Sequence, residues 1–422
     1  MSSGTGSAGL HPLMPRVESE VGVLEQVVIH TPGAEIESMT PRTAQEVLYN
    51  DIIPLAIVRN EHSKLKAFLQ SVCDVFEVAD LLSDQLSDPG IAESVVRAAA
   101  EGSPAAARID ELLALDPPAL AARLIRGLPS RGTTLEGVIS GRQYDLKPIP
   151  NLYFMRDSSM VIGEQVVIGA MAHGVREREA QLLSTVFGSH RVLFDGVRCA
   201  DPGDIRLEGG DLLVVSPDIL LAGISERTSA AAVDRLADAV KAAVDHPVHL
   251  LAVVLPRERS TIHLDMVFTM VGEQTALVYE PVIGGHHSVE VYRVDLHPGR
   301  APRIRATDGL LPALADLGRQ PEVIACGGSD PVVREREQWL SAANVFAFAP
   351  EKIIAYDCNV GTLEAFSAAG FAVEPVDRFL TGTLRVDDYQ RLVVAMPGVN
   401  LARGGGGPRC MTLPVRRVPL SG

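Results

Sequence analysis

The chain of 422 residues has no hydrophobic run near the roughly 18–20 residues that a membrane-spanning helix requires. It has five cysteines but no CxxC pair, a pattern that favours reduced thiols in the cytoplasm over a disulfide framework or a zinc site. Basic residues are also few: 38 Lys and Arg against 53 Asp and Glu give a formal charge of −15. We therefore expect a cytoplasmic protein with neither nucleic acid nor a membrane as partner.

Changes in sequence character predict the domain organisation. The length predicts one large domain with an insertion or a second domain. Residues 1–15, rich in serine and glycine, are expected to form a flexible tail. From 78 to 146, apolar residues recur at helical spacing between proline and glycine stops, which predicts an inserted helical domain. Residues 16–77 and 147–422 would then form the main, catalytic domain.

A strand–turn–strand–helix–strand unit recurs in this main domain. Its hairpins are expected at 159–170, 211–223, 266–279 and 344–356, with helices at 176–185, 229–243 and 361–369. A strand at 24–30 and helical segments at 43–50 and 55–72 precede them. Repetition of this kind predicts α/β blades of similar build around a centre. A doubly wound parallel sheet is the alternative, but it fits less well because hairpins require antiparallel pairs.

Polar residues interrupt the apolar strands at three points: Asp157, the segment Glu208-Gly-Gly-Asp211, and the pair His263 and Asp265. Alternate residues of a strand share a face, so His263 and Asp265 are expected to point the same way. The two glycines between Glu208 and Asp211 permit a bulge or a close backbone approach. Each group also has a simpler interpretation, such as a solvated turn, a surface ion pair or a structural histidine. Because the groups end strands of separate repeats, we expect them to converge.

Cys410 follows four consecutive glycines and is preceded by Arg409, whose positive charge is expected to favour the thiolate. A thiol, an imidazole and several carboxylates, without metal-ligand spacing, suit a guanidinium substrate. This group is planar and cationic, with five N–H donors and no acceptor. Two acids could hold its plane across the path of a thiolate, and an imidazolium could protonate the departing nitrogen.

Five ordered segments, PNLYFMRD, RLEGGD, ISERTS, IHLDMVFT and GPRCM, resemble those of the arginine deiminases. The resemblance covers nearly the whole chain from VGVLEQVVIHTPG onward. It implies a five-bladed, pseudo-symmetric α/β propeller of ββαβ units with an inserted helical domain. It also implies hydrolysis of free L-arginine to L-citrulline and ammonia through a covalent thiouronium on cysteine, without a metal or an organic cofactor.

The resemblance also implies roles for individual residues. Cys410 resembles the nucleophile, His263 the general acid/base, Glu208 its accompanying acid, and Asp157 and Asp265 the pair that grips the guanidinium. The residues implied around the rest of the substrate are Asn151, Phe154, Arg176, Arg227, Asp211 and Arg403, with Arg178 as an alternative to Arg176. Asp157 is followed by Ser158-Ser159, where many relatives have Pro-Phe, which affects the loop rather than the acid.

Several alternatives remain open from the sequence. Within the same fold they are agmatine deiminase, dimethylarginine hydrolase and amidinotransferase. Arginines available for an α-carboxylate favour free arginine over agmatine. A metal-dependent hydrolase using His263, Asp265, Asp157 and Glu208 and a binding module without activity belong to other classes. We also expect a homo-oligomer.

Overall fold

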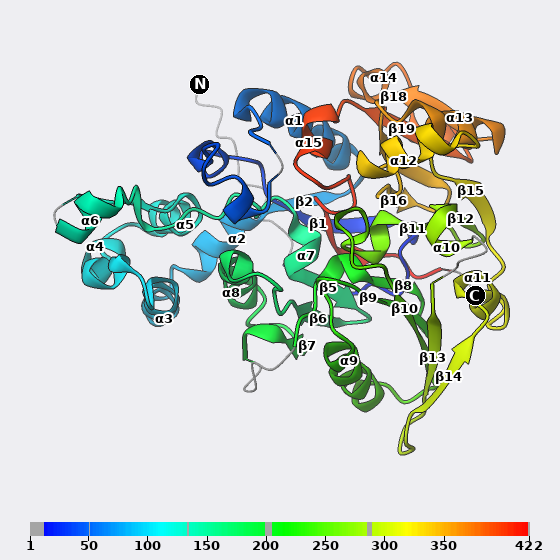
Figure 1. Cartoon of the computed structure of the whole chain (residues 1–422), viewed down its shortest axis with the longest axis horizontal. Coiled ribbons are helices and arrows are strands. Elements are labelled where there is room, and N and C mark those ends of the chain that lie inside the picture. The colour runs from blue at the N-terminus through cyan, green and yellow to red at the C-terminus, as the bar shows by residue number, and fades with distance from the viewer. Residues whose placement is uncertain (1–11, 50, 133–134, 199–204, 285–288, 421–422) are drawn as a thin grey trace, which may run out of the picture.

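The computed structural model describes residues 12–49, 51–132, 135–198, 205–284 and 289–420 (Figure 1). Most of the predicted tail, residues 1–15, lies outside this part of the chain. Arg16 and Val17, which follow the tail, form β-bridges with Arg416 and Gly163. Within the described residues, no helix is long and apolar enough to cross a membrane. The four described cysteines are free, and Cys199 lies outside the described residues.

Five sheets of the described chain share one plan, in which an antiparallel pair is followed by a parallel strand. In chain order they are β5 (Ser159–Ile162), β6 (Gln165–Ile168) and β7 (Val192–Asp195); β8 (Leu212–Ser216), β9 (Ile219–Ile224) and β10 (Val248–Val254); β11 (Phe268–Gly272), β12 (Thr275–Val278) and β15 (Glu322–Ala325); β16 (Phe346–Ala349), β17 (Lys352–Tyr356) and β19 (Leu392–Met396); and β20 (Leu413–Arg417), β1 (Leu24–Ile29) and β2 (Asp74–Glu77). The last sheet joins the two ends of the chain, because β20 pairs with β1.

Further strands extend this plan. The antiparallel strands β13 (Val291–Leu296) and β14 (Arg303–Thr307) lengthen the second sheet beyond β10, and β18 (Ala372–Pro375) lies beside β19. A two-stranded sheet pairs β3 (Leu128–Pro129) with β4 (Tyr144–Leu146). The predicted hairpins at 159–170, 211–223, 266–279 and 344–356 are confirmed by the antiparallel pairs that open four of the five sheets.

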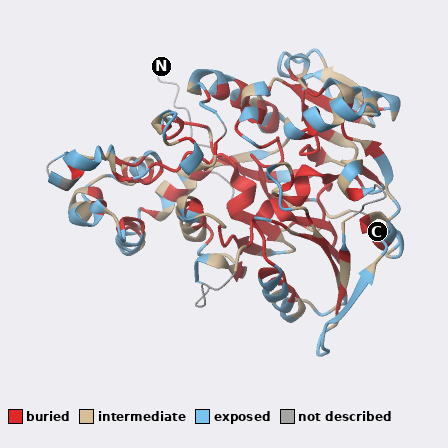
Figure 2. Ribbon diagram, in the orientation of Figure 1, coloured by how far each residue is buried: buried red, intermediate tan, exposed pale blue. Residues whose placement is uncertain are grey.

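Helices cover the sheets and connect their strands. Outside residues 78–146, the α-helices of the described chain are α1 (Leu55–Val72), α7 (Met155–Ser158), α8 (Glu177–Val186), α9 (Ala230–Ala243), α10 (Glu280–Ile283), α11 (Leu310–Ala315), α12 (Pro331–Trp339), α13 (Val360–Ala368), α14 (Val376–Leu380) and α15 (Val399–Arg403). Capping residues explain some of these starts: the Ser229 hydroxyl accepts a hydrogen bond from the Ala232 N–H at the start of α9. Buried residues gather in the sheets and around α7, whereas the outer helix faces are exposed (Figure 2).

Residues 78–146 are mainly helical, as predicted. The helices are α2 (Val78–Gln85), α3 (Pro89–Ala100), α4 (Ile109–Leu113), α5 (Pro117–Arg126) and α6 (Leu135–Ser140). Asp88 and Asp116 accept backbone hydrogen bonds at the starts of α3 and α5, each ahead of a proline. Apolar residues of α2 to α5 share one hydrophobic cluster with β1, α8 and β20. The segment therefore packs onto the main sheets, and Figure 1 shows α3 to α6 extending from them on the left.

The helix predicted at 43–50 is wrong in its extent. The chain forms only a short 3-10 helix, η2 (Gln45–Val47), and Leu48 then adopts a left-handed conformation with φ of 71°. Such a φ is rare for a residue with a branched side chain and ends the helical turn. Asn50 lies outside the described residues.

Candidate active site

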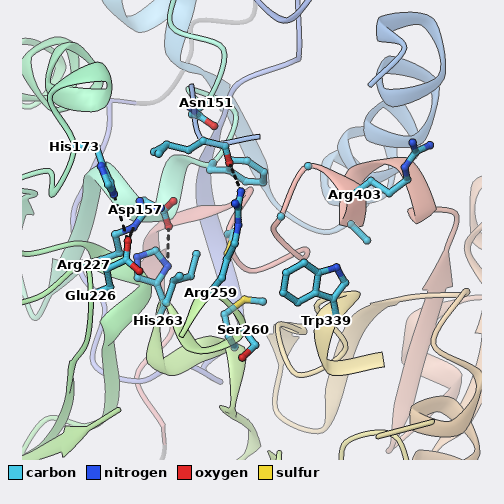
Figure 3. Close-up of a pocket in the computed structure, with 18 of the residues that line it drawn as sticks. Asn151, Asp157, His173, Glu226, Arg227, Arg259, Ser260, His263, Trp339 and Arg403 are labelled. Atoms are coloured by element: carbon cyan, nitrogen blue, oxygen red, sulfur yellow. Dashed lines mark hydrogen bonds and ion pairs between the residues drawn. The ribbon is translucent and has the colours of Figure 1, made fainter. Parts of the chain in front are cut away.

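A cavity of about 530 Å³ opens between the short turns that precede the sheets and the glycine-rich segment before β20 (Figure 3). The residues that line it are Gln45, Leu48, Asp51, Asn151, Phe154, Asp157, His173, Arg176, Glu226, Arg227, Arg259, Ser260, Ile262, His263, Met266, Trp339, Leu340, Ala402, Arg403, Gly404, Gly405 and Cys410. Cys410, His263 and Asp157 thus face one cavity, although they are far apart in the sequence.

The predicted site residues lie in turns that lead into first strands. Asp157 belongs to α7 before β5, Asp211 to the 3-10 helix η6 (Gly209–Asp211) before β8, and Asp265 to the 3-10 helix η8 (Leu264–Met266) before β11. Cys410 occupies the corresponding turn before β20. Equivalent turns therefore bring acids and a thiol from separate sheets to one place.

The expectation that His263 and Asp265 alternate along a strand is wrong. Only His263 is extended, with φ of −138° and ψ of 156°, and Asp265 lies in η8. Their side chains consequently point to different partners: His263 bonds to Glu208, and Asp265 bonds to Arg409. The expected close approach at the glycines is confirmed, because a Cβ at Gly210 would lie 2.5 Å from the His263 ring.

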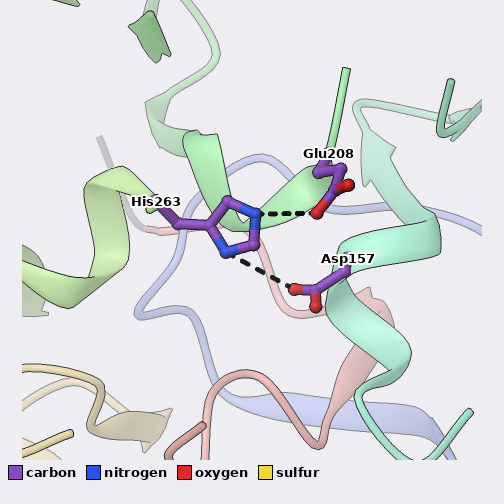
Figure 4. Close-up of side chains that lie close together, drawn as sticks. All are labelled: Asp157, Glu208 and His263. Carbon is purple, nitrogen blue, oxygen red and sulfur yellow. Dashed lines mark hydrogen bonds and ion pairs between the residues drawn. The ribbon is translucent and has the colours of Figure 1, made fainter. Parts of the chain in front are cut away.

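His263 lies between two carboxylates (Figure 4). Its Nε2 is 2.9 Å from Glu208 Oε2, and its Nδ1 is 3.8 Å from Asp157 Oδ1. Burial disfavours the charged imidazolium, but Asp157 and the hydrogen bond to Glu208 outweigh it and raise the pKa of His263 to about 9. Burial opposes the charge on Glu208 as well, yet Arg227 and His263 lower the pKa of Glu208 well below its usual range. The ring is therefore an imidazolium at neutral pH.

Asp157 is held on one side by Arg176. The Arg176 Nη1 donates to Asp157 Oδ2 at 2.6 Å, and the rest of the guanidinium binds Glu179 at 2.8–3.2 Å. Asp157 Oδ1 is buried and accepts no hydrogen bond. One oxygen of this carboxylate is thus anchored, while the other remains an acceptor for a ligand.

Asp265 is arranged in the same way. Arg409 Nη1 donates to Asp265 Oδ2 at 2.7 Å, and Oδ1 is buried without a hydrogen-bond partner. Arg409 in turn donates twice to Glu20, each time at 3.1 Å. Burial of Asp265 raises its pKa despite the charge of Arg409. This carboxylate also offers one anchored and one free oxygen.

The Cys410 thiol is buried, with its Sγ 3.9 Å from Asp265 Oδ2. Burial and the negative charges of Asp265 and Asp157 raise the pKa of Cys410 well above its usual value. The expectation that the charge of Arg409 favours the thiolate is confirmed in direction, but burial and the two acids outweigh it. Arg409 is already paired with two acids, so it offsets only part of their charge.

Among the residues implied around the substrate, Asn151, Phe154, Arg176, Arg227 and Arg403 line the cavity. The alternative, Arg178, instead donates to the backbone carbonyls of Leu124 and Lys147. Asp211 does not line the cavity. Its carboxylate accepts from the Leu264 N–H at 2.9 Å and the Ser225 hydroxyl at 2.6 Å, and burial raises its pKa to about 6.

Sequence reasoning missed several residues of the site. Asn344 precedes β16 as Asp157 precedes β5, and its Oδ1 accepts a hydrogen bond from the Cys410 N–H. The recurring turn before each first strand was the signal that would have found it. Arg259 and Trp339 line the cavity from η7 (Arg259–Thr261) and from the end of α12, and no local pattern marks either residue.

Asp157, Glu208 and His263 also have the spacing of a metal site, with ligand atoms within 4.8 Å of one another. However, Arg176 Nη1 lies 2.6 Å from Asp157 Oδ2 and 3.9 Å from Glu208 Oε2. Arg227 Nη1 is 3.4 Å from the same Glu208 oxygen. A divalent cation would meet two guanidinium groups, so these donors suit a metal poorly.

Comparison with known proteins adds to this geometry. The family profile described as "Arginine deiminase" matches residues 130–417. An arginine deiminase of Mycobacterium tuberculosis (strain ATCC 25618 / H37Rv) is 33% identical over 420 residues, covering 95% of this chain and 98% of that protein. An arginine deiminase of Listeria monocytogenes serotype 4a is 31% identical over 422 residues, covering 96% and 98%.

Two solved structures share the fold at low sequence identity. An amidinotransferase from Microseira wollei superposes with a TM-score of 0.53 at 12% identity, covering 96% of this chain and 98% of that one. A DDAH from Pseudomonas aeruginosa complexed with citrulline gives 0.50 at 14% identity, covering 93% and 99%. The chain thus has the mixed α/β fold of these two proteins.

Proposed function

The chain belongs to the arginine deiminase family, whose hydrolases convert arginine to citrulline, and we propose that it does so through a covalent intermediate on Cys410. The observation that carries this proposal is a buried thiol near two carboxylates, each with one oxygen bound to an arginine and one oxygen without a hydrogen bond. Cys410 Sγ lies 3.9 Å from Asp265, and both Asp157 and Asp265 have a buried Oδ1 without a donor. A guanidinium supplies such donors in one plane.

The bound substrate would generate the nucleophile. With the site empty, the carboxylates disfavour the thiolate. A guanidinium between Asp157 and Asp265 places a positive charge beside Cys410, offsets their field and lowers the thiol pKa. Its central carbon would then face the sulfur, within reach of attack. In this way substrate binding and thiol activation are coupled.

His263 would move the protons. In the first step, the Cys410 thiolate attacks the guanidinium carbon, and the His263 imidazolium donates a proton to the departing nitrogen, which leaves as ammonia. The resulting thiouronium remains on Cys410. In the second step, neutral His263 takes a proton from water, and the hydroxide adds to the same carbon. Expulsion of the thiolate, with transfer of the remaining hydroxyl proton to the sulfur, then releases citrulline and restores the Cys410 thiol.

We extend the proposal to the architecture and the assembly. The five sheets of common plan are proposed to be blades of a five-bladed propeller, with residues 78–146 as an inserted helical domain. We also propose that the enzyme is cytoplasmic and forms a homo-oligomer. The homo-oligomer is supported by apolar side chains that α6 exposes. Leu135, Val138 and Ile139 are 77%, 63% and 77% exposed, and exposed apolar patches often mark protein contacts. If this stripe is a contact, Ile139→Glu will lower the mass measured by light scattering.

The direct test of the activity is a substrate panel of arginine, agmatine and methylated arginines, with citrulline-type products and ammonia measured together. Arginine is expected to give equal amounts of citrulline and ammonia. Cys410→Ala is expected to abolish turnover with an unchanged circular dichroism spectrum, and a chelator is expected to have no effect. Full activity of Cys410→Ala, or activity that a chelator removes and added metal restores, would contradict the mechanism.

A further inference from the structure

Glu20 is a buried acid that does not line the catalytic cavity but binds the residue next to the thiol. Its two oxygens accept from the Arg409 guanidinium, one from Nε and the other from Nη2, each at 3.1 Å. Two parallel bonds of this kind fix the plane of a guanidinium as well as its position. Arg409 Nη2 also donates to the Leu212 carbonyl at 2.8 Å. Glu20 therefore sets the orientation of Arg409.

Glu20 is itself held by contacts with two sheets. Its backbone N–H donates to the Val214 carbonyl in β8 at 2.7 Å, and the Val214 N–H donates to Glu20 Oε1 at 3.4 Å. Two residues later, the Gly22 carbonyl accepts from Arg417 Nη1 in β20 at 2.7 Å. The short segment that carries Glu20 is thus bound to β8 on one side and to β20 on the other.

The orientation of Arg409 decides which oxygen of Asp265 stays free. With Nε and Nη2 bound to Glu20, Nη1 is the nitrogen that binds Asp265, and it donates to Oδ2 at 2.7 Å. Asp265 Oδ1 is left without a hydrogen bond. If Glu20 did not hold it, the guanidinium could turn and bind both oxygens of Asp265, because arginine favours this bidentate arrangement with a carboxylate. It would then occupy the oxygen that the proposed substrate needs.

Glu20 also offsets the charge of Arg409. The guanidinium lies between the carboxylates of Glu20 and Asp265, and the Arg156 Nη1 is a further cationic group 3.9 Å from Glu20. Without Glu20, the charge of both arginines would act more strongly on Asp265 and on the Cys410 sulfur, which is 3.9 Å from Asp265 Oδ2. Added positive charge opposes a cationic substrate and favours a thiolate. Loss of Glu20 should therefore weaken substrate binding and make the thiol more reactive.

We propose that Glu20 is a positioning residue for the reaction: it holds Arg409 so that Asp265 keeps one free oxygen and its negative charge for the substrate guanidinium. The inference rests on the proposed function, because it places this guanidinium between Asp157 and Asp265. Glu20 acts through Arg409 and does not itself touch the substrate.

The test uses Glu20→Gln, which keeps the shape of the side chain and removes its charge, and Glu20→Asp, which keeps the charge but shortens the reach to Arg409. Asp295→Asn is the matched control, because Asp295 is also buried, accepts from Arg293 at 2.6 Å, and does not line the cavity. Wild-type protein is first shown to form citrulline from L-arginine. Failure at that step counts against the proposed function, and alkylation of Cys410 by iodoacetamide then tests the effect of Glu20 on the thiol.

In Glu20→Gln, KM for L-arginine is expected to rise about tenfold with a smaller change in kcat. Alkylation of Cys410 without substrate at pH 8 is expected to become several-fold faster. Glu20→Asp should raise KM less and be alkylated at close to the wild-type rate, and Asp295→Asn should change neither quantity.

A merely structural role for Glu20 would lower kcat and the free energy of unfolding, and would leave KM and the alkylation rate unchanged. That result, or an unchanged value of either quantity in Glu20→Gln, would overturn the proposal. If Glu20→Gln does not fold, an unchanged KM in Glu20→Asp would overturn it, because the shorter side chain cannot bind Nε and Nη2 of Arg409 in the same geometry.

Discussion

The backbone N–H of Cys410 donates a hydrogen bond of 2.9 Å to the side-chain Oδ1 of Asn344. Asn344 is fully buried, and its Nδ2 donates to the Asp265 carbonyl at 3.4 Å. Its own backbone carbonyl accepts from the Arg409 N–H at 3.4 Å. One side chain thus joins the turn that carries the thiol to the turn that carries an acid. Asn344 positions Cys410 without lining the cavity.

We predict that Asn344→Ala lowers kcat about ten- to hundredfold and changes KM less, because losing a buried hydrogen bond costs about 1–3 kcal/mol and here misplaces the nucleophile. Steady-state kinetics with L-arginine measure this split. Thr275→Ala is the control, since Thr275 is also buried, its hydroxyl donates to Glu351, and neither residue lines the cavity. If both variants lose stability alike and neither loses kcat, Asn344 does not position the thiol.

Local patterns predicted much of the fold. The hairpins were evident because apolar runs such as Ile219–Ile224 follow turns rich in proline, glycine and aspartate, and both features are local. The pairing of β20 with β1 was not predicted, because these two strands lie near opposite ends of the sequence. The strand expected around His263 was wrong because η8 bonds within itself and to Asp211.

The candidate site was predictable in its chemistry and much less so in its partnerships. Cys410, His263 and Asp157 were identified by residue type and order, and all three line the cavity. Arg409 donates hydrogen bonds to Asp265 and Glu20, and not to the thiol. These bonds depend on packing between segments about 140 to 390 residues apart. Such contacts leave no periodic trace in the sequence.

The two acids around His263 make stability depend on pH. The pKa of His263 is raised to about 9 in the folded chain, above its ordinary value of about 6.5 when unfolded. The charged ring therefore stabilises the fold fully below pH 6.5, and this contribution is lost as pH rises through 9. We predict that the difference in free energy of unfolding between wild type and His263→Gln narrows from pH 6.5 to pH 10. Urea unfolding at several pH values measures it.

His249→Gln serves as the control for that series, because His249 lies in β10 beside Asp295 and away from the cavity. Subtracting the His249→Gln series removes changes with pH that arise outside the cavity. A difference for His263→Gln that stays constant between pH 6.5 and 10 would mean that the folded-state ring is neutral throughout. A neutral His263 could not protonate the leaving nitrogen, so that proton would have to come from another group.

The negative charges of Asp157 and Asp265 near the Cys410 sulfur predict that two rates change in opposite directions: turnover of L-arginine and alkylation of the thiol. Asp157→Asn and Asp265→Asn preserve shape and remove one negative charge. Turnover of L-arginine is expected to fall at least about a hundredfold, because a buried cation that loses a partner costs about 3–5 kcal/mol. Alkylation of Cys410 by iodoacetamide without substrate is expected to become several-fold faster, because both acids raise the thiol pKa.

Mass spectrometry of the Cys410 peptide at pH 8 separates this thiol from the half-buried Cys73 and Cys358. Asp238→Asn is the control, because Asp238 is an exposed acid of α9 and should change neither rate. Lost turnover with unchanged alkylation would leave the acids as substrate ligands only. Slower alkylation would contradict the electrostatic account, because removing a negative charge beside a buried thiol can only favour its thiolate. Faster alkylation with lost turnover would show two effects of the same carboxylates. They disfavour the Cys410 thiolate, and they bind the substrate cation whose charge favours it.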